Sequence, residues 1–285
     1  MLKDLTIVIP TVGEKDLFNT VRKINFHAND APKKIIIVVH YLNFNKISNK
    51  IKEFKNVKIL ITKKKGQVFQ RNEGFKKVTS KYTLQLDADC LISAKDIKRL
   101  LFVITKKHSK TSIAPVLYDK DTRLPIHSLD NNKNIIIFLK DLIFGFPIGI
   151  KKMGKISKSG SNHGVDPRYT TKEQLECDWL AGGCIMHQTN NLYKRNYFPF
   201  NHKAYCEDLI HSVYLKKKGI TLLVDTRSKC FTTFPIFPKS ITEFKKFLNS
   251  YKYFANIKKI NFLRKIILIT SYKVRFFLKN IIYNL

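Results

Sequence analysis

The sequence has 285 residues, of which 44% are hydrophobic, and its 53 Lys and Arg against 21 Asp and Glu give a formal net charge of +32 at pH 7. A chain of this length and apolar content can bury a full core, which excludes a largely disordered protein. The basic residues are 44 Lys and only 9 Arg, whereas recognition of nucleic acid favours the bidentate guanidinium of Arg. We therefore expect no nucleic-acid partner; the lysines either face an anionic membrane or cover solvated surfaces.

The cysteines and the first residues predict a cytoplasmic protein, and the basic C-terminal residues described below add the expectation that it is peripheral on the inner face of the cell membrane. The five cysteines form no CxxC pair, so they indicate neither a zinc site nor a disulfide framework. The opening stretch, MLKDLTIVIP, contains Asp4 and an apolar run that is too short for a secretory signal.

Short Val- and Ile-rich runs alternate with helical patterns in the first 118 residues. Continuous apolar runs of this kind predict a mostly parallel sheet with helices on both faces, and ligands of such sheets bind beyond the carboxyl ends of the strands. Strands are expected at 5–9, 34–40, 57–61, 82–86 and 112–118, and helices at 16–26, 47–54, 67–78 and 94–106.

The pattern changes after residue 118. Residues 119–176 hold an apolar piece at 135–146 and then a stretch rich in Gly, Ser and Lys, which indicates a mobile loop that orders over a ligand or a plain surface insertion. The segment CDWLAGGCIMHQ (177–188) predicts a strand pair with a close backbone approach at its glycines. YCEDLIHSVYLKKKG (205–219) predicts a helix that ends at a glycine, and ITLLVD predicts one more strand.

The last 47 residues, 239–285, carry 11 Lys and Arg and a single acid, Glu243. The apolar run Ile266–Ile269 is far shorter than the ~20 residues that span a bilayer. Basic amphipathic helices lying on an anionic membrane surface fit this pattern, and the alternative is a helix pair packed on the main domain. We therefore expect one domain at 1–238, followed by a basic helical tail at 239–285.

Two carboxylates, Asp87 and Asp89, stand one residue apart in YTLQLDADC (82–90), where a predicted strand ends. Mg²⁺ and Mn²⁺ usually take one or two carboxylates together with substrate phosphates, so the triplet is a candidate site for a metal–diphosphate. A second pair, Glu207 and Asp208, begins the predicted helix in the later half. These acids either complement the helix dipole or supply a catalytic base.

The stretches TIVIPTVG and KGQVFQRNEGFKKVTSKYTLQLDADC, followed by the Gly-Gly segment and CEDL, occur in an order and spacing that resemble the family 2 glycosyltransferases of the GT-A fold. The resemblance covers about residues 4–232, and it implies a nucleotide-binding half at 1–118 and an acceptor half at 119–238. It implies an α/β fold with a mostly parallel sheet flanked by helices, to which the basic C-terminal helical extension is added.

The resemblance also implies a set of site residues. Asp208 would be the catalytic base, beside Glu207, and Asp89 and Asp87 would hold Mn²⁺ or Mg²⁺. The donor sugar and the acceptor would lie against Trp179, Ala181, Gly182 and Gly183. The donor nucleotide would contact Pro10, Thr11, Val12, His40, Gln67, Arg71, Asn72, Asp87 and Ala88.

Three positions depart from the family pattern. Gln70 replaces a small residue before the arginine, and His40 replaces the acid that usually ends the second strand. The stretch DTRSKCFTTFP lacks the His that often follows the last core strand, and His163 is a possible substitute for it.

The function that we expect is metal-dependent, inverting sugar transfer from a nucleotide-diphosphate donor, UDP-sugar first, to a glycan or polyprenyl-linked acceptor in bacterial surface polysaccharide synthesis, such as capsule or lipopolysaccharide. A nucleotidyltransferase is an alternative, but it needs a Gly-rich loop after the first strand, where PTVGEKD has one glycine. A non-catalytic basic membrane or nucleic-acid binder is a further alternative, which leaves Asp87, Asp89 and Asp208 without a role.

Overall fold

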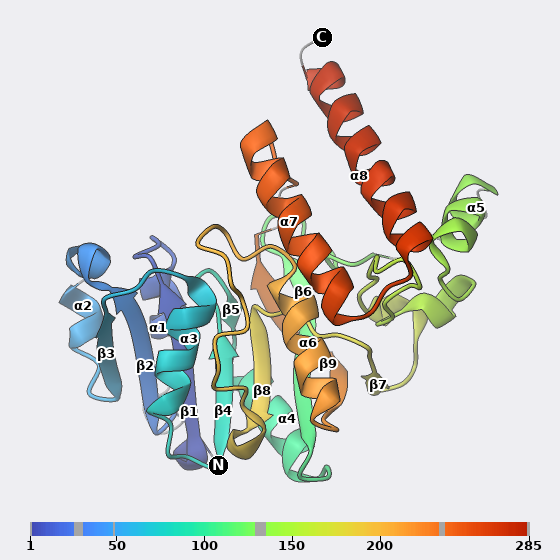
Figure 1. The fold of residues 1–285 in the computed structure, drawn as a ribbon. Helices are drawn as coiled ribbons and strands as arrows, with labels where there is room; N and C mark the ends of the chain where they lie inside the picture. Colours follow the sequence, from blue (N-terminus) through green and yellow to red (C-terminus); the bar gives the residue numbers. More distant parts are fainter. Residues whose placement is uncertain (1, 26–30, 48, 129–134, 234–236, 284–285) are drawn as a thin grey trace.

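The computed structural model describes residues 2–25, 31–47, 49–128, 135–233 and 237–283. Within these residues, strands and helices alternate along the first half of the chain, and two long helices end it (Figure 1). The strands are β1 (Leu5–Thr11), β2 (Lys34–His40), β3 (Val57–Thr62), β4 (Tyr82–Leu86), β5 (Leu91–Ile92), β6 (Thr111–Asp119), β7 (Gln174–Glu176), β8 (Cys184–Gln188) and β9 (Thr221–Thr232). The helices are α1 (Leu17–Ile24), α2 (Asn49–Lys52), α3 (Gln67–Lys76), α4 (Ala94–Thr105), α5 (Ile135–Phe144), α6 (Glu207–Lys217), α7 (Ile241–Ile257) and α8 (Phe262–Tyr283).

The described strands form one sheet in the order β3-β2-β1-β4-β8-β6-β9-β5, with β7 paired on β9. The parallel arrangement predicted for the first half is found in β3-β2-β1-β4. Beyond β4 the sheet is mixed, because β8 enters antiparallel between β4 and β6. Because β4 and β8 are antiparallel, the residues just after β4 lie beside the residues just before β8. The candidate functional site forms at this point.

Both faces of the sheet are covered by helices (Figure 1). Residues alternate between the two faces of a strand, so Ile7 and Ile9 of β1 belong to the core cluster that includes α1 and α4, whereas Val8 packs with α3. Helix α3 approaches the sheet closely at Gly74, where a Cβ atom would lie 2.4 Å from Cγ1 of Val8. A glycine is therefore needed to seat α3, the helix that carries Arg71, at this distance.

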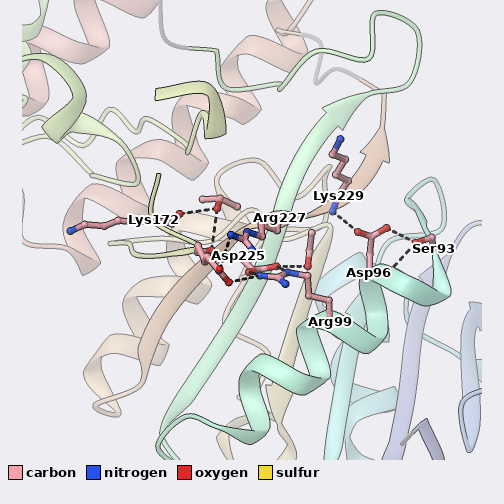
Figure 2. A network of polar contacts seen from close by, with 10 residues as sticks. Ser93, Asp96, Arg99, Lys172, Asp225, Arg227 and Lys229 are labelled. Carbon is pink, nitrogen blue, oxygen red and sulfur yellow. Dashed lines mark hydrogen bonds and ion pairs between the residues drawn. The ribbon is translucent and has the colours of Figure 1, made fainter. Parts of the chain in front are cut away.

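A polar network fixes β9 to α4 (Figure 2). The guanidinium of Arg99 pairs with the fully buried Asp225 at 2.7 Å and with Glu173 at 3.0 Å. Between Asp225 and Lys229 the register of β9 against β6 shifts, and the N–H of Lys229 donates to Asp96, the third residue of α4. The network ties the bulged part of β9 to α4.

Several local predictions differ from the structure. The helix expected at 47–54 is reduced to α2, preceded by a 3₁₀ segment at Tyr41–Lys46. Of the strand pair expected at 177–188, Cys184–Gln188 forms a strand, whereas 177–183 is a loop.

The Gly- and Ser-rich stretch is packed against the C-terminal part of the chain. The side chains of Ser157 and Ser159 are buried, and the Tyr251 hydroxyl of α7 donates to the Ser159 carbonyl at 2.5 Å. These residues therefore form a packed loop, unlike the exposed insertion that was one of the two alternatives.

Helix α7 packs on the domain through buried Phe244, Leu248, Tyr251 and Phe254. Helix α8 packs on α7, and the rings of Phe244 and Phe276 stack with centroids 4.3 Å apart. None of the helices in the described part of the chain is long and apolar enough to cross a membrane. The division into a domain at 1–238 and a tail at 239–285 stays a prediction.

Candidate active site

The candidate site lies where β4 ends and β8 begins. Antiparallel pairing sets Leu86 opposite Cys184, so the Asp87–Asp89 turn lies beside the two glycines before β8. The N–H of Asp87 donates to the carbonyl of Gly183 at 2.8 Å. The side-chain amide of Gln85 donates to the carbonyl of Gly182, which adds a second contact between the same two segments. The D-x-D turn and the Gly-Gly segment therefore form one piece of structure.

Arg71 on α3 joins this turn to the start of α6. One guanidinium nitrogen, Nη2, lies 3.0 Å from Oδ1 of Asp87, and the other, Nη1, lies 2.8 Å from Oε1 of Glu207. The Arg71 side chain is only 1% exposed. Its burial acts to lower the pKa, but the charges of Glu207 and Asp87 raise that pKa above its usual value, so the guanidinium stays charged. Arg71 is therefore a buried bridge between the two carboxylate pairs that the sequence shows far apart.

Glu207 is held on both sides. Arg71 binds one side of its carboxylate, and on the other side the hydroxyl of Tyr197 donates to Oε2 of Glu207 at 2.7 Å. Glu207 itself is buried. Gly182 lies against the same carboxylate, because a Cβ atom at Gly182 would stand 2.5 Å from Oε1 of Glu207. Both carboxylate oxygens of Glu207 are therefore engaged by neighbouring side chains.

Asp208 is the acid of the second pair whose carboxylate remains available. It is half-buried, and its Oδ1 accepts the N–H of Leu209 at 2.9 Å. Burial, followed by the negative charge of Glu207, raises the pKa of Asp208 to about 7. A carboxylate that exchanges its proton near neutral pH has the property of a general base.

The two carboxylates of the D-x-D turn differ in their surroundings. Burial raises the pKa of Asp87 to about 6, although the charge of Arg71 acts to lower it, and the Gln67 side chain hydrogen-bonds to this carboxylate. Asp89 is half-buried and accepts a hydrogen bond from the Thr232 hydroxyl at 3.3 Å. Thr232 thus supplies a polar group at the end of the last core strand, where the family pattern often has a His nearby.

The donor set fits a divalent metal only in part. Among the described residues, no group of three or more His, Cys, Asp and Glu side chains could hold a metal ion on its own. Two adjacent carboxylates are nevertheless the protein contribution that Mg²⁺ or Mn²⁺ commonly uses when the remaining ligands are substrate phosphates and water. Asp89 and Oδ2 of Asp87 are the oxygens that would serve such an ion.

The carboxyl ends of β1 and β2 are tied together beside this turn. The buried amide of Gln70 donates to the carbonyls of Thr11 and Val38, each at 3.0 Å. The Thr11 hydroxyl and the N–H of Val12 both donate to the carboxylate of Glu14, and Val12 is 55% exposed. Pro10 is buried in β1, whereas Val12 is exposed just after this strand; contact of either residue with the donor nucleotide stays a prediction.

His40 and Asn72 are both buried. Nδ1 of His40 accepts the N–H of Leu42 at 3.3 Å, so Nε2 carries the proton and donates to the carbonyl of Lys63 at 3.1 Å. Tyr41 lies against the His40 ring, with centroids 4.4 Å apart, and is 54% exposed. Contact of a nucleotide with His40, Asn72 and the other donor-site residues stays a prediction.

Trp179 lies in the core beside the site. Its ring is 4% exposed, packs edge-on against His127, and donates its N–H to the carbonyl of His163 at 3.1 Å. His163 in turn has its Nδ1 3.0 Å from the carbonyl of Gly164. Gly182 lies against Glu207 and Asp208. Contact with the donor sugar or the acceptor stays a prediction for Trp179, Ala181, Gly182 and Gly183.

Sequence reasoning missed three site residues. Gln85, Tyr197 and Thr232 each make one of the hydrogen bonds that fix the carboxylates or the glycines. A polar residue inside the apolar strand YTLQL was a signal for Gln85, since a buried amide needs a partner. The sequence carries no comparable signal for Tyr197 or Thr232.

A family model described as Glycosyl transferase family 2 matches residues 6–196. A search of curated proteins by sequence finds no match.

Solved structures share the fold. GalNAc-T7 with UDP, GalNAc and Mn²⁺ aligns with a TM-score of 0.62 and 17% identity, over 87% of this chain and 47% of that one. Residues 1–349 of TarS from S. aureus align with a TM-score of 0.53 and 16% identity, over 89% of this chain and 64% of that one. The mannosyltransferase PcManGT from Pyrobaculum calidifontis, in complex with GDP-Man and Mn²⁺, aligns with a TM-score of 0.54 and 12% identity, over 94% and 69%.

This chain therefore spans about half the length of GalNAc-T7 and about two thirds of the other two. At these identities the structural likeness establishes the GT-A fold. The family match covers more than half of the chain and includes the D-x-D turn, Arg71 and the Gly-Gly segment. The chain belongs to glycosyl transferase family 2 and has the GT-A fold.

Proposed function

We propose that the protein transfers a sugar from a nucleotide-diphosphate donor to a hydroxyl group of a glycan or polyprenyl-linked acceptor, with inversion at the anomeric carbon. The observation that carries the proposal is the buried Arg71 bridge. It joins Asp87, in the D-x-D turn, to Glu207, whose neighbour Asp208 has a pKa raised to about 7. A donor-binding carboxylate and a candidate base therefore share one site.

The reaction assigns a separate task to each acid. The oxygen of the acceptor hydroxyl bonds to the anomeric carbon of the donor sugar, and Asp208 takes the proton of that hydroxyl. At the same time the bond between the anomeric carbon and the diphosphate breaks. Attack on the side opposite the leaving group inverts the centre. Glu207 holds the start of α6 through Arg71 and Tyr197, so that the Asp208 carboxylate keeps its direction. Gly182 leaves the space that this arrangement needs.

A divalent metal is part of the proposal. The carboxylate of Asp89 and Oδ2 of Asp87 would hold Mn²⁺ or Mg²⁺ together with the donor diphosphate. The ion would neutralise negative charge on the leaving group. GalNAc-T7 and PcManGT, two proteins of the same fold, are described with Mn²⁺. Because the chain itself offers fewer than three clustered ligands in its described part, we expect the metal and the nucleotide to bind together and each to bind weakly alone.

The donor class and cellular setting complete the proposal. UDP-sugar is the first donor to test, since GalNAc-T7 is described with UDP, and GDP-mannose is the second, since PcManGT is described with it. We place the protein on the inner face of the cell membrane, in synthesis of a bacterial surface polysaccharide such as capsule or lipopolysaccharide. The basic residues 239–285 support contact with an anionic membrane.

The test is a thermal-shift titration with UDP, GDP and dTDP, each with and without Mn²⁺. A ligand at about 100 times its Kd stabilises the folded state by ~2.7 kcal/mol, which raises the Tm by several degrees. We expect a metal-dependent shift for one nucleotide that is lost in Asp89→Asn, retained in Asp208→Asn, and retained in Asp4→Asn, an exposed acid just before β1, at the opposite end of that strand from the site. Asp208→Asn should abolish transfer to acceptor. If none of the three nucleotides stabilises the protein, the donor site is refuted.

A further inference from the structure

Helix α8 has two apolar faces, and the fold buries only one of them. Leu268 and Phe276 are buried, and Tyr272 packs with them toward α7. On another side, apolar residues recur at helical spacing and remain 37–68% exposed, namely Leu263, Ile266, Ile267, Val274, Phe277 and Leu278. The helix has 22 residues, so this stripe extends along most of a length of about 33 Å.

Helix α5 repeats this arrangement from a distant part of the sequence. Its inward side includes the buried Phe144, while Ile135, Phe138, Leu139, Leu142 and Ile143 are 44–68% exposed. Helices α5 and α8 are in contact, near the start of α8 (Figure 1), and the Arg264 guanidinium donates to the carbonyl of Ile143 at 2.7 Å. A cavity of about 630 Å³ at this junction is lined by apolar residues of both helices together with Lys158 and Arg264.

The two helices and the short segment after α5 account for most of the exposed large apolar side chains in the described residues. Fourteen of twenty-one such side chains lie in this region, seven within 135–150 and seven within 262–278. Apolar surface gathered in this way marks an interaction site, whereas single exposed residues do not. We call the exposed side chains of 135–150 and 262–278 the α5–α8 surface.

Basic groups border the α5–α8 surface. Helix α8 contains five Lys and Arg and no acid. Next to the junction, a cavity of about 420 Å³ is lined by Lys155, Lys158, Lys258 and Lys259, with Asp178 as its acid. This cavity and the apolar junction share Lys158 and Asn261, so the cationic and the apolar parts form one continuous site.

We propose that the α5–α8 surface inserts its apolar side chains into the interface of an anionic lipid bilayer, with lipid headgroup phosphates seated at the lysine cavity beside it. Helices with one apolar face and flanking Lys and Arg lie in the plane of the interface in this way. A second copy of the chain is a poorer occupant, because two molecules of net charge +32 would bring basic borders together. The inference deepens the membrane part of the proposed function and rests on that part, while the transfer reaction is not needed for it.

The inference goes beyond attachment by the basic tail alone. Helix α7, which supplies much of the tail, is packed on the domain. Helix α5 lies outside the tail, and together with the segment after it, up to residue 150, it adds half of the exposed apolar side chains of the α5–α8 surface. Variants of α5 therefore distinguish binding by the α5–α8 surface from purely electrostatic binding by the tail. In the second case, loss of an uncharged side chain in residues 135–144 would not change membrane binding.

The experiment is cosedimentation of the full-length protein with vesicles of phosphatidylglycerol and phosphatidylcholine, or of phosphatidylcholine alone. The variants are Leu142→Gln in α5 and Phe277→Asn in α8. Their controls are Leu124→Gln and Phe102→Asn, which remove the same side-chain types at 54% and 46% exposure elsewhere on the surface. All four sites are exposed, so the fold should be kept, and the thermal shift with nucleotide checks this independently.

We expect the wild type to bind the anionic vesicles, with binding weakened by salt. Leu142→Gln and Phe277→Asn should each lower the partition coefficient by about tenfold, and the controls should leave it unchanged. Absence of wild-type binding, or equal binding by all variants, overturns the inference. Concentration-dependent dimerisation that Leu142→Gln abolishes also overturns it, in favour of an interface between two copies. A normal nucleotide shift beside failed vesicle binding would refute only the membrane part, whereas the reverse result would refute only the donor site.

Discussion

Replacing Arg71 by Met should destabilise the protein and weaken nucleotide binding at once. The guanidinium is the cationic partner of two carboxylates, with side-chain exposures of 22% for Asp87 and 8% for Glu207. Removal of one partner from a buried ion pair leaves an uncompensated charge and costs about 3–5 kcal/mol. Because the positive charge of Arg71 acts to lower the pKa of Asp87, its loss should raise that pKa further above about 6. Less of the carboxylate is then ionised at neutral pH for the metal and the donor.

A double-mutant cycle isolates the bridge from other effects of the substitution. Arg71→Met and Glu207→Met remove opposite charges, so the double variant should be more stable than the sum of the two losses implies, by about 2 kcal/mol. Urea unfolding gives each free energy, provided that the slope m stays constant. Arg99→Met is the matched control, since it removes a guanidinium paired with a fully buried acid away from the site. It should lower stability and leave the nucleotide affinity of the folded protein unchanged.

The reasoning is refuted if Arg71→Met costs less than about 1 kcal/mol, which is the range of exposed ion pairs. A coupling energy near zero between Arg71 and Glu207 would refute it as well. Either result would mean that the donor turn and α6 are not joined through the guanidinium in solution.

Three further predictions concern Asp208 and its support. The value of kcat/KM should rise about tenfold per pH unit below pH ~7 and level off above it. The reason is that Asp208 has a raised pKa of about 7 and accepts a proton only when ionised. A value of kcat/KM that does not change with pH below 7 would exclude Asp208 as the base. Gly182→Ala should lower kcat by roughly tenfold or more, since the new Cβ meets Oε1 of Glu207 at 2.5 Å, and unchanged steady-state kinetics would contradict the contact. Tyr197→Phe should cost ~1.5–3 kcal/mol of stability in urea unfolding, as a hydrogen bond to a charged carboxylate is lost; a smaller cost would show that Glu207 does not need this donor.

The strands were the most predictable part of the fold. KIIIVVH and YTLQL form β2 and β4 at the predicted bounds, because continuous apolar runs in a parallel region are buried on both faces. The loop at 177–183 was harder to foresee. Its apolar residues resemble a strand, but they do not join the sheet: Trp179 is buried in a cluster with residues of α6, α7 and α8, and Leu180 packs on residues of β6, β8 and β9.

The site was predicted residue by residue only where a family motif exists. Arg71 and Glu207 are 136 residues apart, and composition and periodicity say nothing of their contact. The contact depends on β8 entering antiparallel beside β4 and on Gly182 admitting the carboxylate. Gln70 was noted as a departure from the pattern, and the structure supplies its reason, since its amide ties the ends of β1 and β2.

The site carries an excess of negative charge, whereas the chain as a whole is strongly positive. Asp87, Asp89, Glu207 and Asp208 interact electrostatically, and Arg71 is the cation that pairs with two of them. In a protein of net charge +32, burial, together with this local excess of negative charge, raises the pKa of both Asp87 and Asp208. A bare diphosphate would add further negative charge and be repelled, whereas a diphosphate that arrives with a divalent cation would relieve the repulsion. The electrostatics of the described residues therefore favour joint binding of metal and donor, which the nucleotide titration with and without Mn²⁺ tests directly.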